Sequence, residues 1–432
     1  MCWFSNRLFS TATLIALAGA VSAAAGDWDA FRGTARNGRS TESNVPLVWG
    51  PENNIRWKVP LPGTGNSSPV VAAGHVYVTC ASDEGRGRGT YCYDRRDGRL
   101  LWSDVVAYEP EDPTHGTNPY CGSSPAADER HVVVWHGSAG VHCYDHAGRK
   151  LWSRDLGTFR HIWGYGSSPV LFGESVLLNC GPGPRQCVTA IDRATGKTRW
   201  QFDVPGGDSG EESPAASEKP AWTGSWATPV VATVEGREQV IVPLAGRLHA
   251  FDPQSGAVLW TIDGLGPLVY TDALMGSDPS GGGVGVAMSG YHGPAIGFRT
   301  GGSGDMTDTN RLWRATSRIP QRIGSGVLID GRVYMANEIG VAQCIDAMTG
   351  EELWHDRLPA TKIWASIIEN QGRLFVTDQQ GKTIIFAANP ERFELVGENE
   401  VGEGTNSTLA FSDGAAFLRT FQSLICISPP GE

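Results

Sequence analysis

A group of aromatic and basic residues interrupts the repeating pattern of this 432-residue chain and offers side chains of the kinds that bind ligands. The group comprises His161, Trp163, Tyr165, Trp222, Trp226, Tyr291, His292, Arg322, Lys362 and Trp364. Aromatic and cationic side chains that meet at one opening can stack on a ligand and hydrogen-bond it, and the cations favour an anionic ligand. The alternative is that these side chains fill the opening and satisfy one another.

No arrangement of residues typical of catalysis stands out elsewhere. The chain has no H-E-x-x-H pair, no G-x-S-x-G turn and no phosphate-binding loop. Asp272 and Asp278 are candidates for a general base, but nothing around them in the sequence indicates a shifted pKa. Asp305 and Asp308 lie in a glycine-rich turn, where acidic side chains are usually solvated. The sequence therefore predicts neither a catalytic residue nor a metal site.

The cysteines favour structural roles. Cys92, Cys143 and Cys344 each lie two residues before an aspartate of the repeat, where other copies have alanine. This pattern predicts small buried side chains. Cys180 and Cys187 flank one loop, and they could form a disulfide in an oxidising compartment or remain reduced.

The elements that would position the binding group come from a repeat with a period of roughly fifty residues. One copy runs from Asp192 to Trp200 with the sequence DRATGKTRW, and other copies end at Trp102, Trp260 and Trp354. The aspartate can hydrogen-bond the backbone of a turn, and the glycine can adopt the positive φ that a tight loop needs. Each copy therefore predicts a hairpin turn, followed by a strand that opens with tryptophan.

Four short strands in each repeat predict an all-β fold, an eight-bladed β-propeller of four-stranded antiparallel blades. The last repeat lacks its fourth strand, whereas residues 55–61 have the pattern of that strand with no strands before it. We therefore expect the N-terminal strand to complete the last blade and close the ring. Burial of the outer-strand tryptophans between adjacent blades is expected to be structural. These tryptophans are Trp57, Trp102, Trp152, Trp200, Trp260, Trp313 and Trp354.

The connections between strands differ on the two faces of the predicted ring. The propeller is expected to span residues 51–432, after a lead-in over residues 26–50. Long and varied loops, over residues 108–122, 205–226 and 265–274, would open on one face, and short uniform turns on the other. Because function concentrates in irregular loops on a rigid scaffold, the loop-rich face is predicted to carry the site.

Composition and the N-terminus indicate an exported protein. The net charge of −11 argues against nucleic acid and anionic lipid as general partners. Residues 1–25 have the features of a signal peptide: Arg7 precedes an apolar stretch, and small residues allow cleavage near Ala23 or Ala25. That stretch is short for a membrane span. We expect a periplasmic or cell-envelope monomer without a transmembrane span.

The turn-to-tryptophan copies, with the Ser-Ser-Pro and Ala-Thr-Pro segments that begin several repeats, resemble the pyrroloquinoline-quinone-like (PQQ-like) propeller repeats. That family includes the quinoprotein alcohol dehydrogenases and the outer-membrane protein assembly factor BamB with its exported relatives. The resemblance implies either a non-catalytic scaffold or an enzyme that uses PQQ and calcium. The adjacent Cys–Cys pair that is common in the dehydrogenases does not occur in this chain.

We therefore expect an exported, non-catalytic binding or scaffold propeller that acts in cell-envelope or outer-membrane protein assembly and needs no cofactor. Its partner would be an envelope protein or a small ligand on the loop-rich face. Two alternatives stay open. One is a PQQ-dependent quinoprotein dehydrogenase with calcium, and the other is a propeller that binds a glycan or another small molecule.

Overall fold

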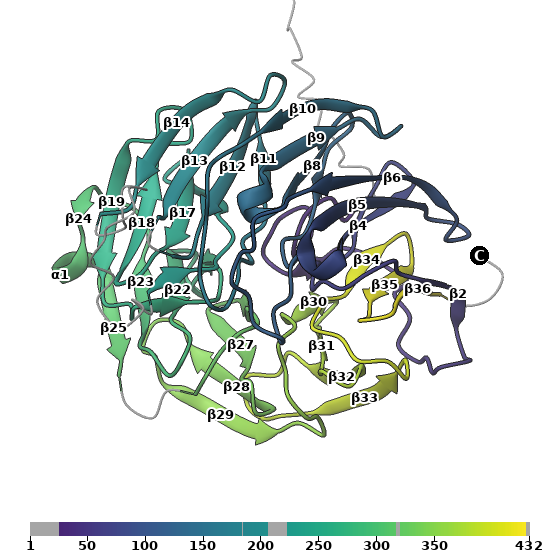
Figure 1. Cartoon of the computed structure of the whole chain (residues 1–432). Helices are drawn as coiled ribbons and strands as arrows, with labels where there is room; N and C mark the ends of the chain where they lie inside the picture. The colour runs from purple at the N-terminus through teal and green to yellow at the C-terminus, as the bar shows by residue number, and fades with distance from the viewer. Residues whose placement is uncertain (1–25, 184, 206–222, 317–319, 429–432) are drawn as a thin grey trace, which may run out of the picture.

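The computed structural model describes residues 26–183, 185–205, 223–316 and 320–428. These residues form eight sheets of four or five strands that are arranged as the blades of a ring, and the colour in Figure 1 passes from blade to blade in chain order. The eight-bladed, all-β propeller predicted from the repeats is confirmed. The predicted signal peptide, residues 1–25, lies outside the described residues. Within those residues no helix is long and apolar enough to cross a membrane.

The first four blades each use consecutive strands, with the first strand innermost. Blade 1 contains β3 (Val70–Ala72), β4 (His75–Ser82), β5 (Gly87–Asp94) and β6 (Leu100–Ala107). Blade 2 contains β7 (Ala126–Ala127), β8 (Val132–Trp135), β9 (Val141–Tyr144) and β10 (Lys150–Arg154). Blade 3 contains β11 (Val170–Phe172), β12 (Ser175–Cys180), β13 (Cys187–Asp192) and β14 (Thr198–Asp203). Blade 4 contains β16 (Val230–Val234), β17 (Arg237–Pro243), β18 (Arg247–Phe251) and β19 (Val258–Asp263).

The remaining blades follow the same plan, except that the last one borrows a strand from the start of the chain. Blade 5 contains β21 (Leu274–Ser277), β22 (Gly283–Met288), β23 (Ala295–Arg299) and β25 (Arg311–Ala315). Blade 6 contains β26 (Val327–Ile329), β27 (Arg332–Ala336), β28 (Val341–Asp346) and β29 (Glu352–Arg357). Blade 7 contains β30 (Ile368–Asn370), β31 (Arg373–Thr377), β32 (Lys382–Ala387) and β33 (Leu395–Glu400). Blade 8 contains β34 (Ala410–Ser412), β35 (Ala415–Arg419), β36 (Ser423–Ile427) and β2 (Ile55–Pro60).

Smaller elements decorate this frame. β15 (Gly224–Ser225) pairs in parallel with β20 (Leu268–Val269) and joins two loops beside blades 4 and 5. β24 (Gly304–Asp305) and helix α1 (Thr307–Asn310) form the enlarged turn of blade 5, and β24 pairs with the outer strand of blade 4. The 3₁₀ turns η1 (Asp83–Gly85) and η2 (Gly137–Ala139) lie in blades 1 and 2.

The outer-strand tryptophans connect neighbouring blades. In six of them the indole N–H donates to a backbone carbonyl in the third-to-fourth-strand turn of the next blade. The six bonds join Trp57 to Arg95, Trp102 to His146, Trp152 to Arg193, Trp200 to Pro253, Trp313 to Ala347 and Trp354 to Asn389. Trp260 differs because the turn of blade 5 is enlarged. Its indole donates to Gln239 of its own blade and its ring packs against Phe298 of blade 5.

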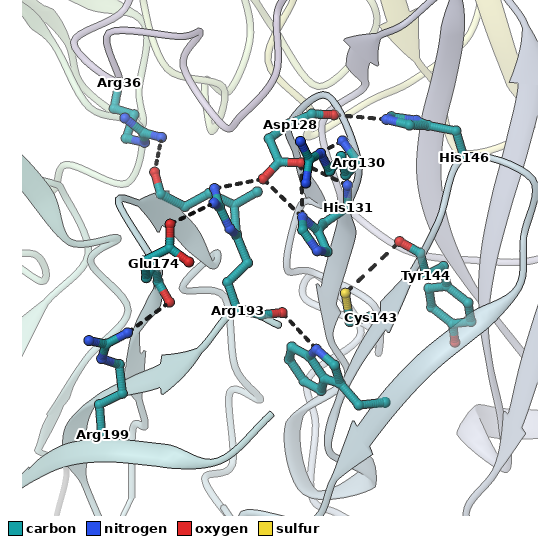
Figure 2. A network of polar contacts seen from close by, with 12 residues as sticks. Arg36, Asp128, Arg130, His131, Cys143, Tyr144, His146, Glu174, Arg193 and Arg199 are labelled. Atoms are coloured by element: carbon teal, nitrogen blue, oxygen red, sulfur yellow. Dashed lines mark hydrogen bonds and ion pairs between the residues drawn. The ribbon is translucent and has the colours of Figure 1, made fainter. Parts of the chain in front are cut away.

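The contact between blades 2 and 3 shows how the turn and the tryptophan fit together (Figure 2). The carbonyl of Arg193 accepts the indole N–H of Trp152 at 2.8 Å, while its guanidinium pairs with Asp128 of blade 2 and Glu174 of blade 3. Gly196 of the same turn has φ of +71°, and a Cβ there would lie 2.8 Å from the Trp152 ring. The repeat therefore needs glycine both for the backbone conformation and for the close approach of the indole.

Ring closure by the N-terminal strand is confirmed. β2 pairs antiparallel with β36, so the two ends of the propeller meet in one sheet (Figure 1). Trp57 of β2 then bonds the Arg95 carbonyl of blade 1, so blade 8 connects to blade 1 as other blades connect to their neighbours.

The lead-in, residues 26–50, runs along the inner strands of several blades. Trp28 exchanges two backbone hydrogen bonds with Val71 of blade 1, and the carbonyl of Asp29 accepts the N–H of Ala127 of blade 2. Arg36 donates to the carbonyl of Leu171 of blade 3. β1 (Arg39–Ser40) then pairs in parallel with β30 of blade 7. The lead-in therefore crosses the ring from one side to the other.

Candidate binding cavity

A closed circle of hydrogen bonds joins all eight blades near the axis of the ring. In each blade, one residue just before or at the start of the inner strand uses its backbone N–H to bond the side-chain oxygen of its counterpart in the next blade. These eight residues, the hydrogen-bond ring, are Ser68, Ser124, Ser168, Thr228, Asp272, Ser325, Ser366 and Thr408. The bonds measure 2.8–3.1 Å, and the last runs from Thr408 back to Ser68. The circle fixes the spacing of the inner strands.

The hydrogen-bond ring surrounds a cavity of about 310 Å³, the central cavity. Its upper wall comes from the loops before the inner strands, including parts of the predicted loops 108–122, 205–226 and 265–274. Phe31 of the lead-in also lines the cavity. The lead-in pairs with Val71, which lies further along the inner strand than Ser68, so Phe31 enters from the end opposite the loops. The central cavity is therefore open on the loop-rich face and closed below by the lead-in.

One side of the cavity is aromatic. Trp163, Trp226, Tyr270 and Tyr291, the aromatic wall, belong to blades 3, 4 and 5 and their loops. The Trp163 ring lies 5.7 Å from Tyr291 and 6.2 Å from Trp226 between centroids, and Tyr270 meets Trp226 edge-on at 5.1 Å. The indole N–H of Trp226 donates to the carbonyl of Gly164 at 3.0 Å, which fixes that ring in place. Mutual ring contacts of this kind hold the aromatic faces in a defined arrangement.

The other side of the cavity carries carboxamides. Asn406, Asn66 and Asn118, the amide wall, belong to the loops that lead into blades 8, 1 and 2. Their side chains form a chain: Asn406 Nδ2 donates to Asn66 Oδ1 at 3.4 Å, and Asn66 Nδ2 donates to Asn118 Oδ1 at 3.2 Å. Asn118 Nδ2 in turn donates to the carbonyls of Trp163 and Tyr165. The amide wall is thus hydrogen-bonded to the backbone around Trp163, which belongs to the aromatic wall.

The cavity wall is almost free of charge. Among the described lining residues, Asp272 is the only aspartate, glutamate, lysine or arginine, and it occupies the position that is serine or threonine in the seven other blades. Its Oδ1 accepts the N–H of Thr228 at 2.8 Å, and its Oδ2 faces Arg32 of the lead-in at 3.5 Å. Burial raises the pKa of Asp272, and Arg32 opposes that rise. Both oxygens of this carboxylate therefore have partners within the protein.

The family model described as "Outer membrane protein assembly factor BamB" matches residues 47–119, 86–263, 184–287 and 303–426. The chain belongs to this family. The propeller is also similar to the solved structure of BamB from Moraxella catarrhalis, with a TM-score of 0.58 and 16% identity over 88% of this chain and 98% of that one. Family membership and fold similarity agree with the PQQ-like repeat predicted from the sequence.

This BamB-family chain is also similar to quinohemoprotein alcohol dehydrogenases. The structure from Comamonas testosteroni has a TM-score of 0.64 and 13% identity, covering 94% of this chain and 81% of that one. In sequence, the quinohemoprotein alcohol dehydrogenase ADH-IIG of Pseudomonas putida is 33% identical over 164 residues. That match covers 35% of this chain and only 21% of the dehydrogenase.

The structure places four of the ten predicted binding residues in the cavity wall: Trp163, Trp226, Tyr291 and Trp364. His161 packs edge-on against Trp226 at 4.9 Å, and burial lowers its pKa to about 4, so it is neutral near pH 7. Tyr165 is buried in the core of blades 2 and 3, where its hydroxyl accepts the N–H of Cys121.

The other predicted residues lie away from the lining. His292 is exposed next to Tyr291, and Lys362 is exposed and pairs with Glu338 at 3.6 Å. Arg322 is buried, with its Nε 3.1 Å from the sulfur of Met335, so it lies among the core side chains near blade 6. Trp222 lies outside the described residues. None of the predicted cations is among the described residues that line the central cavity.

Several lining residues were not among the predicted ones. Asn66 and Asn406 begin Asn-Ser-Ser and Asn-Ser-Thr segments at the same position of two repeats, and that shared position was the available signal. Tyr270 and Gln321 lie in irregular loops without such a marker. Nothing in the sequence indicated that Phe31 lines the cavity, because the lead-in does not follow the repeat.

The other acidic candidates accept hydrogen bonds from residues of their own turns. Asp278 accepts hydrogen bonds from the hydroxyl of Ser280 and from backbone N–H groups of its turn, which lower its pKa to about 2. Asp305 accepts from the Thr307 hydroxyl and faces Arg247, and its pKa is also lowered. Throughout the described ranges, no three His, Cys, Asp or Glu side chains are grouped so that they could hold a metal ion.

Cys180 and Cys187 lie directly opposite each other on β12 and β13 and are free thiols in this structure. Both are buried, and burial raises the pKa of the Cys180 thiol. They lie in blade 3 and do not line the central cavity.

Proposed function

We propose that this chain is an exported, non-catalytic binding propeller of the cell envelope that holds its ligand or partner segment in the central cavity. The observation that carries this proposal is the cavity itself: a space of about 310 Å³ with a fixed hydrogen-bond ring, an aromatic wall and an amide wall. Small-molecule sites are typically concave, mostly apolar and equipped with a few fixed polar groups. The walls of this cavity supply recognition groups, and the one described carboxylate in the lining is already engaged.

Membership of the BamB family supports a role in envelope protein assembly as the setting for this binding. In that role, the loop-rich face would receive a protein segment, because the cavity opens there. The solved similar structure from Moraxella catarrhalis is of BamB itself, and it supports the scaffold form of the proposal through the shared fold.

A quinoprotein dehydrogenase is the second candidate, favoured by the 33% identical match to ADH-IIG. Its cofactor chemistry makes demands that the described residues do not meet. PQQ carries carboxylates, which need cationic partners, but the described lining has neither lysine nor arginine. Calcium takes six to eight oxygen ligands, usually with several carboxylates. The single described carboxylate, Asp272, is bound to Thr228 and Arg32, so the described cavity wall does not fit PQQ with calcium.

Two measurements on the purified full chain test the proposal. Dye-linked oxidation of primary alcohols, with PQQ and calcium added, should stay at the rate of the protein-free control. Capture from envelope extracts should yield a ligand or partner whose retention falls in Trp163→Ala but not in Phe421→Ala. Phe421 is an exposed aromatic that is not in the cavity lining, so it controls for general surface stickiness. Alcohol oxidation above the control, or equal retention by both variants, would contradict the proposal.

A further inference from the structure

We infer that the central cavity binds an uncharged carbohydrate, with a sugar ring stacked on the aromatic wall and its hydroxyls bonded to the amide wall. This inference rests on the proposed function, because it names the ligand class of the same cavity. It commits to a neutral polyhydroxylated ligand, in contrast to the anionic ligand that the basic residues of the sequence suggested. A peptide or an anionic cofactor is a different occupant, and the experiment below separates them.

The aromatic wall provides the stacking surface. A pyranose ring has an apolar face of C–H groups, which pack against aromatic faces as other apolar groups do. Trp163 is central to this surface, since its ring contacts those of Trp226, Tyr270 and Tyr291. Tyr291 remains 48% exposed at the opening, although it is a large aromatic residue. A ligand that covers these rings removes apolar surface from water and stabilises the complex.

The amide wall provides hydrogen-bonding groups that are fixed and uncharged. The Oδ1 atoms of Asn66, Asn118 and Asn406 each accept one hydrogen bond within the protein. A carbonyl oxygen has two lone pairs, so each retains an acceptor site for a hydroxyl group. The side-chain amide of Gln321, also in the lining, makes no hydrogen bond to the described part of the chain and can both donate and accept. Sugar hydroxyls likewise donate and accept, so they match carboxamides.

The charge distribution selects against ionic ligands. Lys362 pairs with Glu338, and Arg322 lies in the protein core, so neither cation is in the described lining. Burying an ionised ligand without an opposite charge is costly, whereas a neutral hydroxyl needs only a hydrogen-bond partner. The carboxylate of Asp272 is neutralised by Arg32 from outside the cavity. The described wall thus favours a ligand that is polar but uncharged.

The shape of the cavity indicates that it takes the end of a sugar chain. Its volume of about 310 Å³ is at the small end of ligand sites, which span roughly 300–1,000 Å³. Phe31 closes the lower end, while the loop-rich face is open. A terminal sugar can therefore enter and stack while the rest of the chain extends into solvent.

The test measures binding of neutral trisaccharides to the full chain by isothermal titration calorimetry and ligand-observed NMR. The probes are maltotriose, cellotriose, xylotriose and N-acetylchitotriose, with trigalacturonic acid and PQQ as anionic controls. We expect at least one neutral trisaccharide to bind with a Kd below about 1 mM, and the anions to bind at least about tenfold more weakly. Trp163→Ala should weaken sugar binding at least about tenfold, because it removes the centre of the stacking surface.

Two further variants separate the walls and control for folding. Gln321→Ala should weaken binding by about three- to tenfold, since one amide that reaches the ligand is lost. Phe421→Ala should leave the affinity unchanged. All variants should stay folded at the temperature of the binding assay, because Trp163 and Gln321 are only partly buried, and thermal unfolding checks this.

The outcomes distinguish the two levels of the proposal. If none of the four trisaccharides binds at about 10 mM, while PQQ or a captured peptide binds and loses affinity in Trp163→Ala, the carbohydrate inference is wrong and the binding cavity stands. If sugars bind equally well to the parent and to Trp163→Ala, the inference is also wrong, because the ligand lies elsewhere. If no probe binds and capture from extracts is the same for the parent and Trp163→Ala, the proposed function itself fails.

Discussion

The buried ion pair between Arg32 and Asp272 connects the lead-in to the hydrogen-bond ring, and its removal gives a quantitative prediction. Arg32 is 1% exposed and Asp272 4% exposed. In Arg32→Met the carboxylate of Asp272 stays buried without a counter-charge, which typically costs about 3–5 kcal/mol. Arg32 also donates from Nη2 to the carbonyls of Asn37 and Gly326, and losing these bonds adds about 1–2 kcal/mol. The free energy of unfolding should therefore fall by about 4–7 kcal/mol.

The second substitution of the cycle restores the residue type of the other blades. Asp272→Thr alone leaves Arg32 buried without an anion, so we expect a loss of about 3–5 kcal/mol. In Arg32→Met with Asp272→Thr, no uncompensated charge remains and the threonine hydroxyl can still accept the N–H of Thr228. The double variant should recover about 3–5 kcal/mol relative to Arg32→Met and retain only the loss at the two carbonyls.

Urea denaturation followed by tryptophan fluorescence measures these differences, and pH provides an internal check. Burial raises the pKa of Asp272 in the folded state, so folded Asp272 binds a proton more readily than unfolded Asp272. Arg32 opposes that rise, so its removal should raise the pKa of Asp272 further. The deficit of Arg32→Met should therefore be complete above the pKa of Asp272 in the variant and should shrink as the pH falls toward the pKa of Asp272 in the folded parent. The reasoning is refuted if Arg32→Met lies within about 1 kcal/mol of the parent, or if the double variant is no more stable than either single variant.

Three further predictions concern other parts of the molecule. Gly196→Ala should destabilise the protein by about 1–3 kcal/mol more than Gly74→Ala in thermal unfolding, because both glycines have positive φ but only Gly196 lies against an indole of the preceding blade. Mild oxidation should form a disulfide between Cys180 and Cys187, because they face each other on paired strands. The disulfide lowers the mass of the non-reduced peptide that contains both cysteines by two hydrogens. Alkylation of both thiols after oxidation would contradict this prediction. Stability should decrease as the pH falls from about 6.5 toward 4, because burial lowers the folded pKa of His249 to about 4 and the unfolded chain then binds more protons. His249→Asn should lose less stability than the parent over that range in urea denaturation, and an equal loss would show that other groups cause it.

The blades and their contacts could be predicted from the sequence because their signals are local and repeated. An aspartate, a glycine and a tryptophan at fixed spacing specify a turn and the strand after it, and the displaced copy at Trp57 specifies ring closure. The same regularity marked the residues that depart from it, and Trp163, Trp226 and Trp364 do lie in the cavity wall.

The lower end and the charge of the cavity could not be predicted in this way. Arg32 and Asp272 are 240 residues apart, and neither belongs to a local motif, so their pairing is visible only in three dimensions. Arg322 is in an irregular loop before an inner strand, where the offset from the repeat does not determine the direction of the side chain. Its guanidinium lies against Met335, so the cation expected at the opening of the cavity lies in the protein core instead.

The hydrogen-bond ring also has an electrostatic consequence for whatever enters the cavity. All eight N–H groups donate in the same rotational sense, each to the next blade along the chain, with the last returning to the first. The components of these dipoles that lie in the plane of the circle run head to tail, so they largely cancel around it. A helix N-terminus concentrates partial positive charge and attracts anions. This circle concentrates no partial charge of that kind at one end, because each N–H group is paired with a side-chain oxygen of the next blade.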